Sequence, residues 1–126
     1  MADATVAAPS RSTVRPRALR PGGTIAVVLP ASAVDAGQIE AGISGLQAAG
    51  FQVRLPPDPL ARRGYLASTD DATKAAAIDA AFADPEVGAV LCARGGYGSM
   101  RLLPLIDWQP IRANPKPFVG FSDVTG

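Results

Sequence analysis

The segment Val87–Ser99, with the sequence VGAVLCARGGYGS, decides the fold because it joins an apolar run to a glycine-rich one. Residues 87–92 are mostly apolar, which predicts a short buried strand covered on both faces. The glycines at positions 95, 96 and 98 then predict a tight turn whose backbone can approach another group closely. A short helix is expected from there to Leu103, because Pro104 breaks its continuation. This order of strand, turn and helix is the building unit of a parallel α/β sheet.

The rest of the chain repeats the alternation of strand and helix. Strands are predicted at residues 24–29, 51–55 and 118–121, and helices at residues 35–49, at residues 72–82 and directly after Asp107. The predicted fold class is therefore α/β, with a flavodoxin-like parallel sheet flanked by helices, in one domain over residues 20–126. The carboxyl ends of parallel strands lie at one edge of a sheet, so the loops at residues 30–34, 94–99 and from 122 onward should meet there.

Two helical signals support this assignment. In the first helix Ile39, Ile43 and Leu46 recur at spacings of four and three, which predicts one apolar face. In front of the second helix Ser68 and Asp71 have the spacing of a capping box.

Composition excludes several classes of protein. The chain has 126 residues, 48% of them hydrophobic and 18% charged, which is typical of one globular domain. Its apolar runs are far shorter than the roughly 20 residues of a membrane span, and a net charge of +1 favours no nucleic-acid partner. Residues 1–19 are predicted to be a disordered tail, although their Arg- and Ser-containing, acid-poor composition is also that of a transit peptide.

The cysteine and histidine content limits the disulfides and metal sites that the chain could form. Cys92 is the one cysteine and the chain has no histidine, so neither a disulfide framework nor a zinc site is expected. A single thiol favours a reducing compartment, and we interpret Cys92 as a core residue.

The glycine-rich turn between Arg94 and Ser99 leaves three interpretations open. Its backbone N–H groups could bind an anion at the start of a helix, or they could stabilise an oxyanion in acyl transfer. The turn could also do no more than let the helix pack on its strand. It matches neither the dinucleotide-binding G-x-G-x-x-G pattern nor a P-loop. Arg94 could hold a substrate carboxylate, or it could be a solvent-facing charge at a strand end.

The other candidate for chemistry is Gly120-Phe121-Ser122-Asp123, which has the form of half a nucleophile elbow. In such an elbow a serine lies at a strained turn between a strand and a helix. Val124 replaces the second glycine of the G-x-S-x-G pattern, which argues against an ordinary lipase or esterase. A serine nucleophile also needs a general base, and the chain contains no histidine. Ser122 or Asp123 could instead cap the next helix.

Five segments together resemble one family in their order and spacing. They are Gly23–Ser32, Arg63–Ala67, Ala81–Pro85, Cys92–Ser99 and Asn114–Thr125. On these segments the chain resembles the N-terminal domain of the LD-carboxypeptidases, a family of serine peptidases that includes muramoyltetrapeptide carboxypeptidases and microcin C immunity peptidases. The resemblance covers residues 20–125, and it implies that the sequence stops just after the nucleophile elbow, without the family's C-terminal domain.

The resemblance implies a site and a reaction. Ser122 would be the nucleophile, and the backbone N–H groups of Gly96 and Asp123 would form the oxyanion hole. The substrate cleft would be lined by four residues of the glycine-rich turn, namely Arg94, Gly95, Tyr97 and Gly98. The implied reaction is cytoplasmic hydrolysis, through an acyl-enzyme and without a metal or other cofactor, of the bond to the terminal D-alanine of murein tetrapeptides. The triad glutamate and histidine would belong to the C-terminal domain, so the chain by itself is expected to be inactive.

Two other interpretations stay open. The chain could be a stand-alone flavodoxin-like module that binds an anion or a nucleotide, or a truncation product without function. No membrane or nucleic-acid partner is expected, and the resemblance implies a possible homodimer in the full-length family. It also implies exposed apolar surface on the side of Ser122, where a C-terminal domain would pack.

Overall fold

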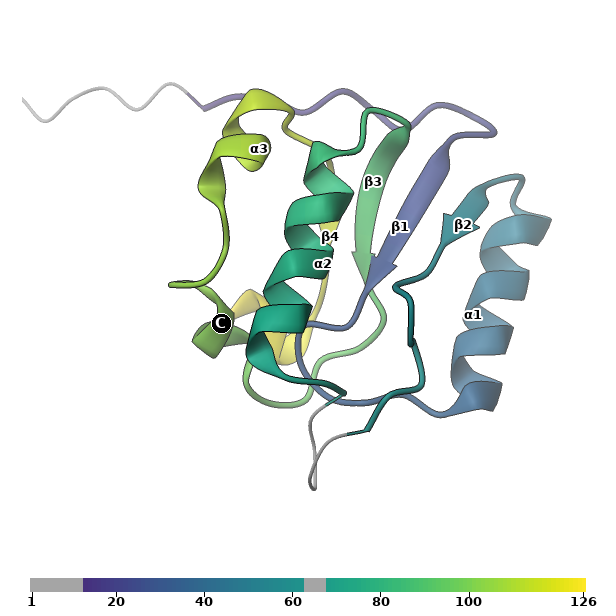
Figure 1. Ribbon diagram of the computed structural model, residues 1–126. Coiled ribbons are helices and arrows are strands. Elements are labelled where there is room, and N and C mark those ends of the chain that lie inside the picture. The colour runs from purple at the N-terminus through teal and green to yellow at the C-terminus, as the bar shows by residue number, and fades with distance from the viewer. Residues whose placement is uncertain (1–12, 63–67) are drawn as a thin grey trace, which may run out of the picture.

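The computed structural model describes residues 13–62 and 68–126 (Figure 1). Its strands are β1 (Thr24–Val28), β2 (Gln52–Arg54), β3 (Val87–Cys92) and β4 (Phe118–Val119). Its helices are α1 (Ala36–Ala48), α2 (Asp71–Ala83) and α3 (Trp108–Ala113), with the 3-10 turns η1 (Ser99–Leu102) and η2 (Ser122–Thr125). The predicted strands and helices are all present, most of them with slightly shifted ends, whereas β3 has the predicted bounds. The family-like segment Arg63–Ala67 and most of the predicted tail lie outside the described residues.

The four strands form one parallel sheet in the order β2-β1-β3-β4. Val28 of β1 lies opposite Cys92 of β3, and Leu91 lies opposite Val119 of β4. This sheet with its flanking helices confirms the predicted α/β class. Because the strands are parallel, their carboxyl ends lie at one edge, at the bottom of Figure 1, where the glycine-rich loop also lies.

One face of the sheet carries the main core. Helix α2 lies across this face (Figure 1) and contributes Ile78 and Phe82, each 4% exposed. These side chains pack in one cluster with Val90 of β3 and Leu102 of η1. All residues of β1 are buried, as the prediction of a strand covered on both faces requires.

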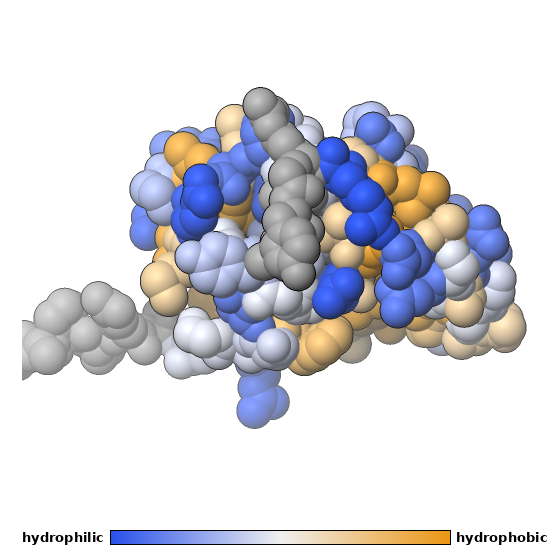
Figure 2. All heavy atoms as spheres, turned by 90° about the horizontal axis from the view of Figure 1, so that it is seen from below, coloured by the Kyte–Doolittle hydropathy of each residue, from blue (hydrophilic) through white to orange (hydrophobic). Residues whose placement is uncertain are grey.

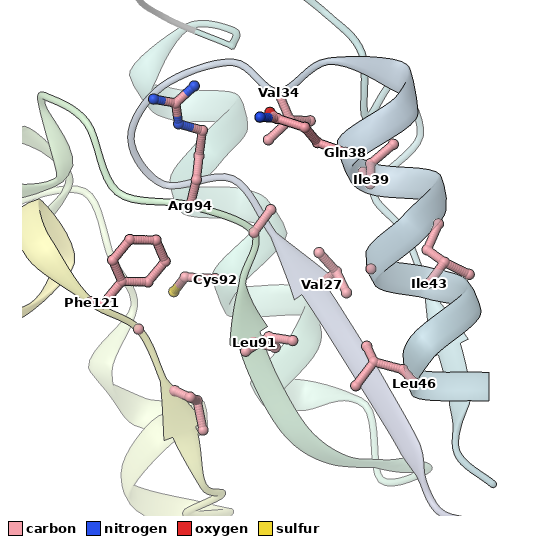
Figure 3. Close-up of a pocket in the computed structure, with 14 residues that line it drawn as sticks. Val27, Val34, Gln38, Ile39, Ile43, Leu46, Leu91, Cys92, Arg94 and Phe121 are labelled. Atoms are coloured by element: carbon pink, nitrogen blue, oxygen red, sulfur yellow. The ribbon is translucent and has the colours of Figure 1, made fainter. Parts of the chain in front are cut away.

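The other face of the sheet is only partly covered. Ile39, Ile43 and Leu46 of α1 face the sheet, as their spacing predicts, but α1 contains no buried residue. They line one side of a groove of about 760 Å³, and Val27 and Leu91 of the sheet line it as well (Figure 3). The apolar face of α1 stays half-buried because the helix lies beside the edge strand β2 (Figure 1) and not over the centre of the sheet.

The N-terminus of α2 differs from the prediction. Asp70 caps the helix, and its carboxylate accepts a hydrogen bond from the N–H of Thr73 at 2.9 Å. The hydroxyl of Ser68 instead donates to the carbonyl oxygen of Leu29 at 3.2 Å. The predicted capping box of Ser68 and Asp71 is therefore wrong, because Asp70, which is nearer to the helix, occupies the capping position. The hydrogen bond of Ser68 instead connects its loop to the residue that follows β1.

The C-terminus of α2 is capped by a lysine from a distant part of the chain. Lys116 is 8% exposed, and its ammonium group donates to the carbonyl oxygens of Ala81, at 2.7 Å, and Asp84. A cation at this position satisfies unpaired carbonyl groups and the negative end of the helix dipole. Burial lowers the pKa of Lys116. Since Lys116 precedes β4 by two residues, this contact also fixes where β4 and the turn after it lie.

Candidate active site

Three loops meet at the carboxyl edge of the sheet, and hydrogen bonds connect them. The N–H of Ser32, in the loop after β1, donates to the carbonyl oxygen of Gly95 at 3.4 Å. The N–H of Ser99, at the end of the glycine-rich loop, donates to the carboxylate of Asp123 at 2.9 Å. Figure 2 views the molecule from this edge and shows hydrophobic groups at the surface beside hydrophilic ones. The loops that the sequence predicts to form the site are therefore in contact.

Ser122 follows β4 in a strained backbone conformation. Its φ angle is 57°, and among the described residues it alone has a positive φ without being a glycine. A left-handed conformation of this kind costs a residue with a side chain about 1–2 kcal/mol, and it persists where the surrounding fold imposes it. The residue is exposed. An exposed, strained serine between a strand and a helical turn has the geometry of a nucleophile elbow.

The residues beside Ser122 explain how the elbow forms without its second glycine. A Cβ atom at Gly120 would lie 2.7 Å from Cγ1 of Val124 and 3.5 Å from Sγ of Cys92, so no side chain fits two positions before the serine. Val124, which replaces the missing glycine, packs half-buried against the main core. The valine is accommodated because it packs inward, so its presence does not prevent the turn.

The glycine-rich loop lies directly against the serine. A Cβ atom at Gly95 would lie 2.8 Å from Cβ and 3.2 Å from Oγ of Ser122, an approach that favours glycine. Gly96 has a φ of 124°, which also favours glycine. Within the described residues, the backbone N–H groups of Gly96 and Asp123 donate no hydrogen bond. The structure thus brings the predicted nucleophile and both predicted oxyanion donors to one edge of the sheet.

Asp123 anchors the elbow and does not act on the hydroxyl of Ser122. Its carboxylate accepts the N–H of Ser99, and the hydroxyl of Ser99 donates to the carbonyl oxygen of Asp123 at 2.7 Å. The hydrogen bond that the carboxylate accepts from the N–H of Ser99 lowers the pKa of Asp123. No role is predicted for Ser99 from the sequence, where its position at the start of a helical turn is the one local signal for it.

The other residues predicted to line the cleft differ in their contacts and in their exposure to solvent. The guanidinium of Arg94 donates to the carbonyl oxygen of Ala33 at 3.1 Å, and the residue lines the groove beside α1 (Figure 3). Gly98, with a φ of 98°, directly precedes η1 at its N-cap position. Tyr97 and Phe121 are 66% and 59% exposed. The apolar surface that we expect near Ser122 is therefore present.

No general base for Ser122 is found in the part of the chain that the structure describes. Oγ of Ser122 makes no hydrogen bond there, and the sequence contains no histidine. Lys74 is 4% exposed, and burial lowers its pKa. Burial raises the pKa of Cys92 to about 12, so it is an unreactive core thiol, as predicted.

Residues 13–62 and 68–126 contain no group of three or more His, Cys, Asp or Glu side chains that could hold a metal ion. The helices among them are all too short or too polar to cross a membrane.

Comparison with known proteins identifies the family. Residues 25–126 match the N-terminal domain of the LD-carboxypeptidases. The chain belongs to the LD-carboxypeptidase family, as its motifs predict.

Individual relatives show how much of the family's length the chain covers. It is 47% identical over 119 residues to the Streptomyces coelicolor protein SCO6489, covering 91% of this chain and 38% of that protein. It is 38% identical over 104 residues to the murein tetrapeptide carboxypeptidase of Pseudomonas aeruginosa, covering 82% and 34%. The solved structure of the microcin C7 self-immunity protein MccF superimposes with a TM-score of 0.84 at 25% identity, covering 90% and 34%. The chain spans 34–38% of the length of these proteins.

Proposed function

We propose that the chain supplies the nucleophile-bearing part of a serine-type carboxypeptidase that removes the terminal D-alanine from murein tetrapeptides. The observation that carries this proposal is the strained Ser122, held against Gly95 at the edge where Gly96 and Asp123 present free backbone N–H groups. Family membership supports the class of reaction, and the name of the Pseudomonas aeruginosa relative supports the substrate. A single buried thiol suits a cytoplasmic site of action.

In the proposed reaction, Oγ of Ser122 attacks the carbonyl carbon of the peptide bond that precedes the terminal D-alanine, and its proton passes to a general base. The carbonyl oxygen becomes negatively charged and accepts hydrogen bonds from the N–H groups of Gly96 and Asp123. Collapse of this intermediate breaks the C–N bond, so that D-alanine leaves with the proton and an acyl ester remains on Ser122. Water, deprotonated by the same base, hydrolyses the ester and restores the hydroxyl.

We propose that the general base comes from outside this sequence, which contains no histidine. We propose that a glutamate and a histidine supply it from a region equivalent to the part of the relatives that this chain does not span, as the family resemblance implies. Arg94 uses one guanidinium nitrogen on Ala33, and its other N–H groups remain able to bind a substrate carboxylate. Tyr97 and Gly98 would form the neighbouring wall of the cleft.

The proposal can be tested with a chimera in which residues 20–126 replace the matching first third of the Pseudomonas aeruginosa enzyme. Release of D-alanine from murein tetrapeptide is measured. We expect the chimera to release D-alanine and the Ser122→Ala variant to be slower by roughly 10³-fold or more, because the acyl-enzyme can no longer form. The 126-residue chain alone should release none.

Ser44→Ala is the matched control, since Ser44 is an exposed serine within α1 and does not belong to the loops that carry the site. This variant should keep the activity of the parent chimera. A fluorophosphonate probe should label the parent and the Ser44→Ala variant but not Ser122→Ala. Equal activity of Ser122→Ala and its parent would refute the nucleophile assignment. A chimera that unfolds cooperatively, yet neither releases D-alanine nor takes up the probe, would refute the function.

A further inference from the structure

Ser32 connects the loop after β1 to the glycine-rich loop, and its role goes beyond the chemistry described above. The residue is 4% exposed. Its N–H donates to the carbonyl oxygen of Gly95 at 3.4 Å, and its Oγ accepts the N–H of Tyr97 at 3.2 Å. A single buried serine thus holds the backbone on both sides of Gly96.

The side chain of Ser32 also packs against Gly96 itself. A Cβ atom at Gly96 would lie 2.0 Å from Oγ and 2.5 Å from Cβ of Ser32. The serine hydroxyl therefore rests on the Cα of Gly96, in space that any side chain at position 96 would occupy. Together with the φ of 124°, this contact restricts the peptide planes on either side of Gly96.

These contacts select which amide of the loop is free. The N–H of Tyr97 is used by Ser32, whereas the N–H of Gly96 donates to no atom of the described residues. Gly95, the preceding residue, touches Ser122. Of these two amides, the free one therefore belongs to the residue that directly follows Gly95.

We propose that Ser32 is a positioning residue that fixes the glycine-rich loop so that Gly96, and not Tyr97, presents its N–H beside Ser122. This inference rests on the proposed function, because an oxyanion donor matters only if Ser122 is acylated. Removing the hydroxyl leaves the N–H of Tyr97 without its acceptor and opens space beside Gly96, so the peptide planes of the loop can turn. A misplaced oxyanion donor lowers the rate of the chemical step and leaves ground-state binding of substrate nearly unchanged.

The first test uses the 126-residue chain and requires no activity. The chain offers a matched control, since Ser68 is 3% exposed and its hydroxyl also bonds to backbone, but to Leu29 and not to the glycine-rich loop. Amide hydrogen exchange is measured by NMR in the parent, in Ser32→Ala and in Ser68→Ala. We expect the Tyr97 amide to exchange roughly fivefold faster or more in Ser32→Ala than in Ser68→Ala, because only the former loses the acceptor of this N–H. Equal exchange of Tyr97 in the two variants would overturn the proposal.

The second test measures kcat and KM in the chimera. Ser32→Ala should lower kcat by roughly 10- to 100-fold with little change in KM, as expected for a displaced oxyanion donor. Ser68→Ala, with a comparable loss of a buried hydrogen bond, should keep kcat. An unchanged kcat in Ser32→Ala would refute the positioning role while leaving the proposed function intact if Ser122→Ala is inactive. If the proposed function itself were wrong, the parent chimera would be inactive.

Discussion

Replacing Gly120 by alanine tests how the elbow is packed. The new Cβ would lie 2.7 Å from Cγ1 and 3.1 Å from Cβ of Val124, and 3.5 Å from Sγ of Cys92. Carbon atoms are in favourable contact at roughly 3.5–4.0 Å, so β4 or η2 has to move. Overpacking of this kind costs about 1–3 kcal/mol, and we expect Gly120→Ala to lower the free energy of unfolding by that amount.

The same contacts predict a partial rescue. Val124→Ala removes Cγ1, the atom that would be closest to the new methyl group. Alone, this change deletes half-buried methyl groups and should also destabilise the chain. In the double variant, however, the methyl group at position 120 fills part of the space that the valine leaves. The double variant should therefore lose about 1 kcal/mol less of its free energy of unfolding than the two single variants lose in total.

Urea denaturation followed by circular dichroism measures all four free energies of unfolding. Gly45→Ala is the matched control, because Gly45 lies within α1 and a Cβ atom there would meet nothing within 4 Å. This control should be neutral or stabilising by about 0.5–1 kcal/mol, since alanine favours helix over glycine. Our account of the elbow is incorrect if Gly120→Ala is as stable as the parent, or if the two losses simply add.

Two further predictions concern the strained serine and its anchor. Ser122→Gly should raise the free energy of unfolding by about 1 kcal/mol, because glycine adopts a φ of 57° without the steric penalty of a side chain. A lower melting temperature in this variant would contradict the proposed strain. The hydrogen bond from the N–H of Ser99 holds the pKa of Asp123 below its ordinary 3.8. The carboxylate therefore contributes stability that is present above pH 3.8 and is lost as the pH falls through the lower folded value. Stability measured between about pH 2 and 6 should consequently fall less steeply with acid in Asp123→Asn, and identical pH profiles would show that this carboxylate does not contribute.

Much of the fold could be predicted from local patterns. The burial of a strand on both faces produces a continuous apolar run, and β3 was predicted at its observed bounds, Val87–Cys92. The prediction that Asp107 begins a helix is confirmed, because its side chain accepts the N–H of Gln109. Signals of this kind depend on residues a few positions apart, so they can be read along the chain.

Other features could not be predicted because they depend on packing between distant residues. The spacing of Ile39, Ile43 and Leu46 predicts the apolar face of α1, but it does not show that the helix lies beside the edge of the sheet and leaves a groove. Ser68 has the correct spacing for a cap, yet the carbonyl oxygen of Leu29 is its partner. In both cases the local pattern is compatible with several environments, and tertiary contacts select one.

Some features of the candidate site could likewise be predicted from the sequence, and others depend on tertiary contacts. The sequence by itself determined the order of strands and helices, the family, and the residue types at the loop edge, because these depend on local periodicity and on motif spacing. The tertiary structure alone decided that Ser122 is strained, that it touches Gly95, and that Ser32 and Ser99 hold the two halves of the site. Ser32 and Tyr97 are 65 positions apart. A contact over that separation exists only once β1 and β3 pair and their carboxyl ends lie side by side.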